Sequence, residues 1–348
     1  MFESLKQSVL SKGDKGDSVV ALHGDPVSMS PVGGGTYPRA NYLQDGSIIG
    51  AYTAFEHGYS IITLVRSTDG GATWSPLGTA ARALTSENDL DNPYPLQLPS
   101  GRVLVAFRNH SKDPSTGRYT FYRITICYSD DNGATWKYLS TPASDPGGPN
   151  GNWEPFLRNA ADGTLQLYYS RENSPMDQDN LMRTSTDGGV TWSSATVISG
   201  AELHDARDGM VGVTETNDGH LLAVFETGQN GRFTINSVRS TDGGRTWGNR
   251  ARVYTPTGLH NNAGAPQIVN VGGRLYVSFM TDEDSHGYTW PRGAAAKLVV
   301  SDDNGHTWGG KIKVRDIHSN WPGLLALDSR SFLCMYDNGG VVAQKLVH

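Results

Sequence analysis

The chain has 348 residues, of which 42 are glycine and only 18% are charged. This composition suits a turn-rich protein built from strands, and it excludes the disordered and coiled-coil classes. A formal net charge of −6, without any basic run, argues against a nucleic-acid partner.

The N-terminal segment from Met1 to Gly16 lacks the apolar core of a signal peptide, and no stretch of the chain approaches 18 uncharged apolar residues. The sequence therefore predicts neither a membrane span nor a membrane partner. We expect either a cytosolic protein or a chain from which a leader has been removed. Cys127 and Cys334 lie in apolar strand-like runs and are expected to be buried thiols, although the sequence leaves their pairing open.

A pattern of two apolar strands separated by a tight turn occurs six times along the chain. The second strand of each pair is the more strongly apolar. The six instances are, in chain order, Tyr42 to Tyr52, Leu96 to Phe107, Phe156 to Tyr169, Val211 to Phe225, Ile268 to Phe279 and Leu324 to Met335.

Five of these units continue into one repeated phrase of the form S-x-D-[GN]-G-x-T-W. The copies begin at Ser67, Ser129, Ser185, Ser240 and Ser301, so they are 55 to 62 residues apart. That period is too long for one hairpin and matches four strands with their turns. The Gly and Asn residues tolerate positive φ, and the Asp can accept backbone N–H bonds. We therefore expect these Asp residues to hold a turn and not to bind a ligand.

The repeats predict an all-β fold, a six-bladed β-propeller that carries five of the repeated turns. The sixth unit reaches the C-terminus after Val341 to Val347 and lacks an outer strand. A strand at about residues 18–24, around Val19 to His23, is expected to pair with this last blade and to close the ring. Residues 1–348 then form a single domain, which we expect to be a monomer.

In a four-stranded blade the first and third turns share one face, so the repeated phrases and the Asp-Gly turns lie together. The opposite face receives the residues that enter the first strand and leave the second strand, and these converge on the central axis. The predicted entering positions are Arg39, Asn92 to Tyr94, Glu154, Arg207-Asp208, Gln267 and Trp321. The predicted leaving positions are Phe55-Glu56, Arg108-Asn109, Arg171-Glu172, Glu226, Asp282 to Asp284 and Tyr336-Asp337.

Two glutamates at these positions are the candidate catalytic residues. Glu154 follows Trp153 and precedes an apolar Pro-Phe pair, where partial desolvation raises the pKa of a carboxyl, as a general acid requires. A salt bridge from Glu154 to Arg158 is the structural alternative. Glu226 follows the apolar run Leu221 to Phe225 and emerges into a polar loop. Because blades three and four are neighbours, we expect the two carboxyls to face each other at the roughly 5–9 Å used in glycoside hydrolysis.

Other side chains at the converging positions are candidate substrate contacts. Asp208 could accept sugar hydroxyls or form a structural ion pair with Arg207. Arg39 and Arg171 could position a carboxylate of the substrate or of a catalytic Glu. Flat apolar faces suited either to sugar rings or to packing between blades belong to Tyr94, Trp153, Trp290, Trp321 and Tyr336. The predicted substrate-binding set is Arg39, Asn92, Tyr94, Trp153, Arg171, Asp208, Trp321 and Tyr336.

Motifs for other chemistries are missing from the sequence. It contains no metal-ligand spacing such as H-E-x-x-H, no phosphate-binding Gly loop and no G-x-S-x-G phrase. We therefore expect hydrolysis without a cofactor or a metal ion.

The repeated phrase is the Asp-box, or BNR repeat, and five copies at this spacing resemble the sialidase superfamily over essentially the whole chain. The resemblance implies the propeller fold, on which sialidases, other hydrolases and non-catalytic binding modules are all built. Sialidases carry an arginine triad, a Tyr-Glu nucleophile pair and an Asp acid, with the first arginine in a [FY]-R-I-P phrase. The matching place here reads Tyr37-Pro38-Arg39-Ala40, which argues against sialic acid.

Residues 152–156, 204–211 and 224–227 look more like the fungal exo-arabinanases of glycoside hydrolase family 93. Carried over residue by residue, this resemblance gives the catalytic roles to Glu154 and Glu226. It implies a retaining exo-glycosidase that releases arabinobiose from the non-reducing end of linear α-1,5-L-arabinan, a plant cell-wall polymer. It also implies secretion, with the leader absent from this chain. The assignment of acid/base and nucleophile stays open, although the local context favours Glu154 as the acid.

Three other functions remain as alternatives. An exo-sialidase would use Arg39, Arg207 and a further arginine, with Tyr336 as the nucleophile. A non-catalytic propeller would bind a glycan or a protein and release no product. A carbohydrate lyase would release unsaturated sugars.

Overall fold

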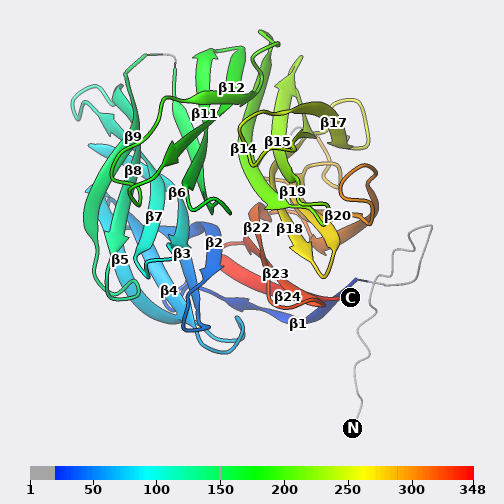
Figure 1. The fold of residues 1–348 in the computed structure, drawn as a ribbon, viewed down its shortest axis with the longest axis horizontal. Helices are drawn as coiled ribbons and strands as arrows, with labels where there is room; N and C mark the ends of the chain where they lie inside the picture. The colour runs from blue at the N-terminus through cyan, green and yellow to red at the C-terminus, as the bar shows by residue number, and fades with distance from the viewer. Residues whose placement is uncertain (1–19, 149, 288) are drawn as a thin grey trace.

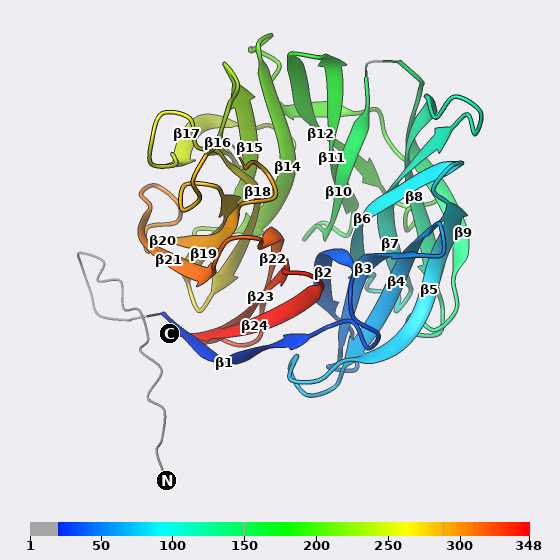
Figure 2. The same ribbon diagram turned by 180° about the vertical axis from the view of Figure 1, so that it is seen from behind.

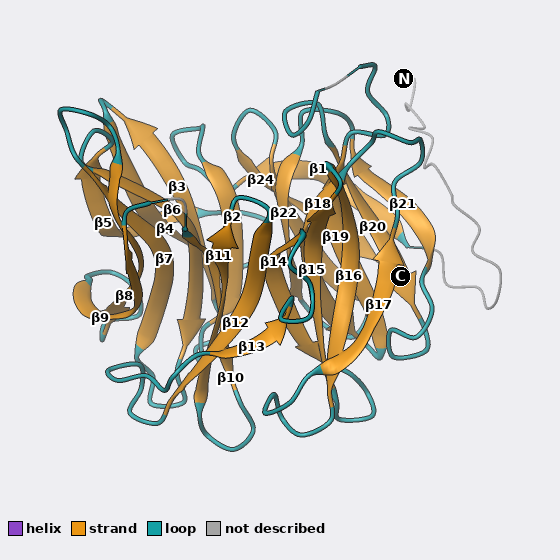
Figure 3. Ribbon diagram, turned by 90° about the horizontal axis from the view of Figure 1, so that it is seen from above, coloured by secondary structure: helices purple, strands orange, loops and turns teal. Residues whose placement is uncertain are grey.

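The apolar runs fold into strands and the repeated phrases form turns throughout the part of the chain that the structure describes. The structure, a computed structural model, describes residues 20–348 except residues 149 and 288. It contains 24 strands, and none of the described residues is helical (Figure 3). The described residues therefore include no helix of the length and apolarity that a membrane span requires. Met1 to Gly16 and the first residues of the predicted closing strand lie outside the described residues.

The strands form four four-stranded sheets and one eight-stranded sheet. The first sheet contains β2 (Thr36–Tyr42), β3 (Ile48–Glu56), β4 (Tyr59–Ser67) and β5 (Ser75–Leu84). The second contains β6 (Asn88–Gln97), β7 (Val103–Lys112), β8 (Tyr119–Ser129) and β9 (Lys137–Pro146). Two later sheets contain β18 (Ala263–Val271), β19 (Arg274–Thr281), β20 (Ala295–Ser301) and β21 (Gly309–Arg315), and then β22 (Asn320–Ala326), β23 (Ser331–Asp337), β24 (Val341–Val347) and β1 (Ala21–Ser28).

The eight-stranded sheet has two antiparallel halves. One half contains β10 (Asn152–Asn159), β11 (Leu165–Ser174), β12 (Asp177–Ser185) and β13 (Thr196–Ser199). The other contains β14 (Ala206–Glu215), β15 (Leu221–Gln229), β16 (Arg232–Ser240) and β17 (Gly248–Tyr254). A single parallel pair, Gln178 opposite Arg207, joins the two halves.

The sheets stand around a common axis in a propeller-like arrangement (Figure 1, Figure 2). The innermost strands contact one another in a closed circle that runs through β2, β6, β10, β14, β18 and β22. The expected all-β, propeller-like architecture is thus confirmed. Each predicted pair of apolar strands corresponds to the first two strands of a sheet or of a half-sheet.

The N-terminal strand completes the last sheet. β1 pairs antiparallel with β24, from Ala21 opposite Val347 to Ser28 opposite Val342 (Figure 1). It extends beyond the predicted end at residue 24, and Pro26 lies within a register shift of this edge strand. Proline is tolerated there because its missing N–H leaves no ladder bond unmade.

Each repeated phrase forms the same hydrogen-bonded turn. The Ser67 hydroxyl donates to Asp69 Oδ1 at 2.8 Å and accepts the N–H of Gly71 at 2.8 Å. Asp69 also accepts the N–H of Thr73 at 2.8 Å and the Thr73 hydroxyl at 2.5 Å. The same bonds recur in the other four copies, around Asp131, Asp187, Asp242 and Asp303. The turn-holding role expected of these Asp residues is confirmed.

Every innermost strand carries a one-residue bulge. In β2, Thr36 and Arg39 lie opposite Thr53 and Ala51, so β2 has one residue more than β3 over this stretch. Equivalent bulges occur in β6, β10, β14, β18 and β22. The bulge residue has a positive φ, which is uncommon outside glycine, in all six cases: Tyr37, Asn92, Glu154, Met210, Ala265 and Trp321.

Apolar clusters fill the spaces between neighbouring sheets. Cys127 belongs to the cluster between the first two sheets, and Cys334 belongs to the cluster between the last two. Both cysteines are buried and free, as the apolar runs around them predicted.

Asp131→Ala is expected to lower the Tm by a few degrees at neutral pH. Its carboxylate holds the second Asp-box turn, and the hydrogen bonds from Thr135 and Ser129 lower its pKa from 3.8 to about 2. The stabilisation is present above pH 3.8 and is lost as the pH falls toward 2, so the Tm difference should shrink over that interval. Thermal unfolding at several pH values measures it. Glu87→Ala, which removes an exposed carboxyl in the turn between β5 and β6, is the control and should leave the Tm unchanged.

Candidate active site

The bulges and the Asp-box turns lie at opposite ends of the sheets. Ile48 pairs with both Tyr42 and Ser67, which places the β2–β3 turn and the first Asp-box at the same end. The bulge at Tyr37 lies toward the other end of β2, beside the β3–β4 hairpin. Because the innermost strands form a circle, the bulge residues gather on the face that the sequence predicted for the site.

The bulge residues, Tyr37, Asn92, Glu154, Met210, Ala265 and Trp321, form what we call the inner ring. Next to them is an outer ring, made of the residues that pair with the position before each bulge: Thr53, Arg108, Ser170, Glu226, Met280 and Asp337. Polar and ionisable groups occur in both rings. The two predicted catalytic residues are therefore at equivalent heights, Glu154 in the inner ring and Glu226 in the outer ring of the adjacent half-sheet.

Glu154 is half-buried, and the pKa of its carboxyl is raised from 4.5 to about 8. Desolvation is the main cause, and the negative charge of Glu226 adds to it. Arg108 acts in the opposite direction. A carboxyl with this pKa keeps its proton at neutral pH and can donate it, which is what a general acid must do.

Glu226 has a pKa of about 7, raised from 4.5 by desolvation and partly offset by a hydrogen bond and by Arg207. The hydrogen bond comes from the N–H of Ala265, which lies 2.7 Å from Glu226 Oε2. Gly264 leaves the space for this contact, because an added Cβ there would lie 2.5 Å from the same oxygen. The bulge in β18 thus presents a backbone donor to the carboxylate of Glu226.

An ion-pair network lies on the other side of Glu154. Arg108 donates from Nη2 to Asp89 Oδ1 at 3.0 Å and to Asp91 Oδ2 at 3.3 Å. Asp91 also accepts the Thr53 hydroxyl at 2.7 Å. The pKa of Tyr37 is raised to about 12 by burial, with further contributions from Glu154 and Asp91. Tyr37 is therefore neutral and can donate a hydrogen bond at this edge of the site.

The remaining side of the two rings is apolar. Tyr37, Met210, Ala265 and Met280 form a buried cluster, against which Trp290 and Trp321 pack. The rings of Tyr37 and Trp321 lie 6.4 Å apart. The site therefore combines ionisable groups with partly buried aromatic surface, a combination common in small-molecule sites.

Three predicted substrate contacts need correction because the protein itself occupies or covers them. Asp208 has no exposed surface, and both of its oxygens accept hydrogen bonds from Arg250, at 2.6 and 2.8 Å. Tyr336 is also fully buried, in the apolar cluster between the last two sheets. Arg39 is 2% exposed and donates to the carbonyl oxygen of Trp321 at 2.9 Å. None of the three can meet a substrate in this conformation.

Other predicted contacts are divided between the rings and their surroundings. Asn92 and Trp321 belong to the inner ring, where Asn92 is buried and Trp321 is partly exposed. Tyr94 lies two residues beyond its bulge and packs on Phe156, with ring centroids 4.4 Å apart. Trp153 packs against His110 of β7, with ring centroids 4.8 Å apart, so the Trp153 ring contacts the neighbouring sheet. Arg171 is exposed, and its Nε lies 3.5 Å from Asp145 Oδ2.

The sequence reasoning missed Tyr37, Met210 and Ala265 as members of the inner ring. It placed the entering positions two residues later, at Arg39 and Gln267, or two to three residues earlier, at Arg207-Asp208. A signal was available, since five of the six bulge residues precede a proline. Proline is concentrated at bulges because it has no N–H to leave unpaired.

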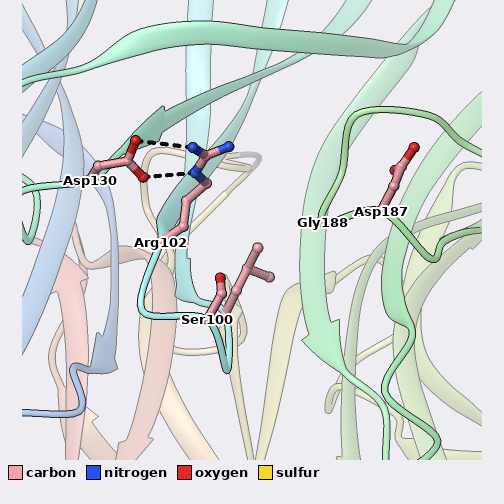
Figure 4. A pocket seen from close by; sticks show the side chains of 6 residues that line it. Ser100, Arg102, Asp130, Asp187 and Gly188 are labelled. Carbon is pink, nitrogen blue, oxygen red and sulfur yellow. Dashed lines mark hydrogen bonds and ion pairs between the residues drawn. The ribbon is translucent and has the colours of Figure 1, made fainter.

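A separate hollow of about 430 Å³ lies on the Asp-box face, between the second sheet and the half of the eight-stranded sheet that contains β10 to β13 (Figure 4). It is lined by Leu98, Ser100, Arg102, Asp130, Asp187 and Gly188. Arg102 and Asp130 bind each other there at 2.8 and 3.0 Å, which satisfies both charges. This hollow has no carboxyl of raised pKa and lies at the end of the sheets opposite the two rings. Within residues 20–148, 150–287 and 289–348, no group of three or more His, Cys, Asp or Glu residues is arranged to hold a metal ion.

A family model described as a BNR repeat-like domain matches residues 56–320. The chain belongs to this family. The predicted relationship to the sialidase superfamily is thereby confirmed. Two curated relatives are sialidases, from Paraclostridium sordellii (25% identity over 257 residues, 64% of this chain and 58% of the relative) and from Clostridium perfringens (25% over 188 residues, 45% and 47%). The chain thus spans about half the length of these curated relatives.

Solved structures share the fold over nearly the whole chain. An α-L-arabinanase of Penicillium chrysogenum complexed with arabinobiose matches with a TM-score of 0.71 and 20% identity, over 92% of this chain and 97% of that one. A GH93 α-L-arabinofuranosidase of Fusarium graminearum with arabinobiose matches with a TM-score of 0.72 and 22% identity, over 93% and 96%. The NanB sialidase of Streptococcus pneumoniae matches less well, with a TM-score of 0.60 and 11% identity, over 89% and 67%. At these identities the likeness concerns the fold.

Glu154→Gln is expected to raise the Tm at pH 8 more than at pH 4.5. Folding raises the pKa of this carboxyl from 4.5 to about 8, so it favours the folded state below pH 4.5 and loses this contribution as the pH rises toward 8. Glutamine has a similar shape but no charge, so the variant does not lose this stability as the pH rises. Thermal unfolding at both pH values tests this, with Glu87→Gln, a substitution of an exposed turn residue, as the control. An unchanged or lower Tm of Glu154→Gln at pH 8 would contradict the raised pKa.

Proposed function

We propose that the chain is a retaining exo-glycosidase that releases arabinobiose from the non-reducing end of linear α-1,5-L-arabinan. The observation that carries the proposal is the pair Glu154 and Glu226, two carboxyls of raised pKa on adjacent half-sheets, of which the charge of Glu226 raises the pKa of Glu154. Such a pair is the machinery of glycoside hydrolysis. The fold shared with an arabinanase and an arabinofuranosidase, both with arabinobiose bound, supports an arabinose-containing substrate.

We assign Glu154 as the acid/base and Glu226 as the nucleophile. The pKa of Glu154 is the higher of the two, about 8 against about 7, so a single shared proton resides mainly on Glu154. In the first step Glu226 attacks the anomeric carbon while Glu154 protonates the leaving glycosidic oxygen. In the second step Glu154 deprotonates a water molecule, which attacks the same carbon and releases Glu226.

We also infer that the propeller has six blades. The two halves of the eight-stranded sheet are joined by one residue pair only, Gln178 opposite Arg207. Each half carries its own bulge, at Glu154 and Met210. Counted by innermost strands, the ring therefore has six units. An extracellular, monomeric enzyme belongs to the same proposal, because a cell-wall polymer is degraded outside the cell.

A sialidase is the competing function, since two curated relatives carry that name. Recognition of a sialic acid carboxylate relies on exposed arginines, and here Arg39 is buried. Tyr336, the nucleophile of that alternative, is also buried and has no exposed surface. These positions favour a neutral sugar.

Incubation with debranched arabinan, pectic galactan and a sialyl reporter tests the substrate class. We expect arabinobiose as the product from arabinan and no product from the other two. Proton NMR of the first product formed should show the anomeric configuration of the substrate, because two inversions at one carbon restore it. Release of sialic acid from the sialyl reporter, with no product from arabinan, would reject the proposal in favour of the competing function. Saturable binding of arabinan without any product would make the chain a binding module.

Glu154→Ala and Glu226→Ala are each expected to lower kcat by several orders of magnitude while the fold is retained. The two variants should differ in rescue. Azide should restore turnover of an activated α-L-arabinoside by Glu154→Ala with a glycosyl azide of retained α configuration, and by Glu226→Ala with one of inverted β configuration, because azide replaces the missing group on opposite faces of the sugar. Circular dichroism and Tm serve as folding controls. Near-normal turnover in either variant would remove that residue from the mechanism.

A further inference from the structure

The two half-sheets that carry Glu154 and Glu226 are the only neighbouring units fused into one sheet in the part of the chain that the structure describes. The fusion is the parallel pair between Gln178 of β12 and Arg207 of β14. It lies on the candidate-site face, since Gln178 pairs with Glu172 near the end of β11. A fusion found only between these two units calls for a local cause, and the side chain of Arg207 provides one.

Arg207 belongs to β14 but binds three groups of the β11–β12 hairpin. Its Nη2 donates to Glu172 Oε1 at 2.5 Å and to Gln178 Oε1 at 2.8 Å. Its Nη1 donates to the carbonyl oxygen of Pro175 at 3.1 Å. The planar guanidinium is suited to such a fixed, several-point attachment, whereas an ammonium group is not.

The partners of Arg207 continue to both glutamates. The second oxygen of Glu172 accepts the N–H of Gly151 at 2.8 Å, and the Glu172 N–H donates to the Gly151 carbonyl oxygen at 2.9 Å. Gly151 precedes Glu154 by three residues. On the other side, the side-chain amide of Gln178 donates to the carbonyl oxygen of Asp208 at 2.8 Å. The next residue, Gly209, pairs with Glu226 across β14 and β15.

The charges of this network act on both carboxyls. Arg207 lowers the pKa of Glu154 and that of Glu226, against the stronger effect of desolvation. The other groups that act on Glu154 are Glu226, Arg108, Glu172 and the hydroxyl of Tyr37. Glu226 is further affected by the N–H of Ala265. Arg207 is thus the one cation that acts on both members of the pair.

We propose that Arg207, together with Glu172 and Gln178, is a positioning unit that holds the two half-sheets at the separation which makes Glu226 a nucleophile. The inference rests on the proposed function and deepens it. Retaining enzymes hold their carboxyls about 5–5.5 Å apart, whereas inverting enzymes leave about 6.5–9.5 Å for a water molecule. A shift of one or two ångströms between the half-sheets therefore changes the chemistry. Arg207 has no role in bond making itself.

The first test needs no substrate. The side-chain carboxyls are titrated by carbon-13 NMR in the wild type, Arg207→Met and Glu172→Gln. Arg207→Met should raise the pKa of both Glu154 and Glu226, and Glu172→Gln should lower that of Glu154. Arg102→Met is the matched control, because Arg102 forms an equally close pair with Asp130 on the opposite face. Unchanged titration of both glutamates in folded Arg207→Met would overturn the proposal.

The second test uses turnover of arabinan, or of an aryl arabinoside. Arg207→Met should lower kcat by about 10²-fold with a smaller effect on KM, as expected for misplaced catalytic groups. Arg207→Lys keeps the charge but not the several-point attachment, so its titration should resemble the wild type while its kcat stays low. A normal kcat in Arg207→Lys would show that charge alone matters and would reject the positioning role. If the wild type hydrolyses no glycoside, the proposed function fails, and the titration still decides whether Arg207 controls the carboxyl pair.

Discussion

The one-residue bulge in each innermost strand is the constraint on which the candidate site depends. A regular strand would alternate its side chains, and the bulge instead places one residue of every unit at the same height beside the axis. Five of the six bulge residues are neither glycine nor asparagine, and a positive φ costs such residues about 1–3 kcal/mol each. Packing of Tyr37, Met210 and Ala265 in one buried cluster offsets this strain. The molecule therefore accepts local strain in order to aim Glu154 inward.

The electrostatics of the site follow from this geometry. Glu154 and Glu226 are both partly buried, and desolvation raises both pKa values, while the charge of Glu226 adds to the rise at Glu154. Three groups partly offset this rise in pKa. Arg108 and Arg207 lower the pKa of Glu154, and the N–H of Ala265 and Arg207 lower that of Glu226. The result is a pair that holds one proton near neutral pH, which is the state that double-displacement chemistry needs. Strain in the backbone and desolvation of the acids thus serve one purpose.

The five Asp-boxes lie at one end of the sheets, and the candidate site lies at the other end. The Asp-boxes close turns at one end of the sheets through the same set of hydrogen bonds, and none of their Asp residues takes part in either ring. The shared scaffold therefore says little about the sugar, and a few side chains on the other face decide it. In this chain Arg39 and Tyr336 are buried, whereas Glu154 and Glu226 are each partly exposed.

The sequence by itself determined the strand pairs and the Asp-box turns, and it placed the two candidate glutamates at strand ends. Each of these depends on residues that are contiguous in the chain: a Ser-x-Asp-x-Gly phrase forms its own turn, and a carboxyl after an apolar run marks a strand end. The tertiary structure alone decided which polar groups stay free. Asp208 is paired with Arg250, 42 residues away, and Arg39 donates a hydrogen bond to the carbonyl oxygen of Trp321, 282 residues away. The contacts of Arg207 with the β11–β12 hairpin could not be predicted from the sequence either, because burial and ion pairing depend on neighbours that only folding brings together.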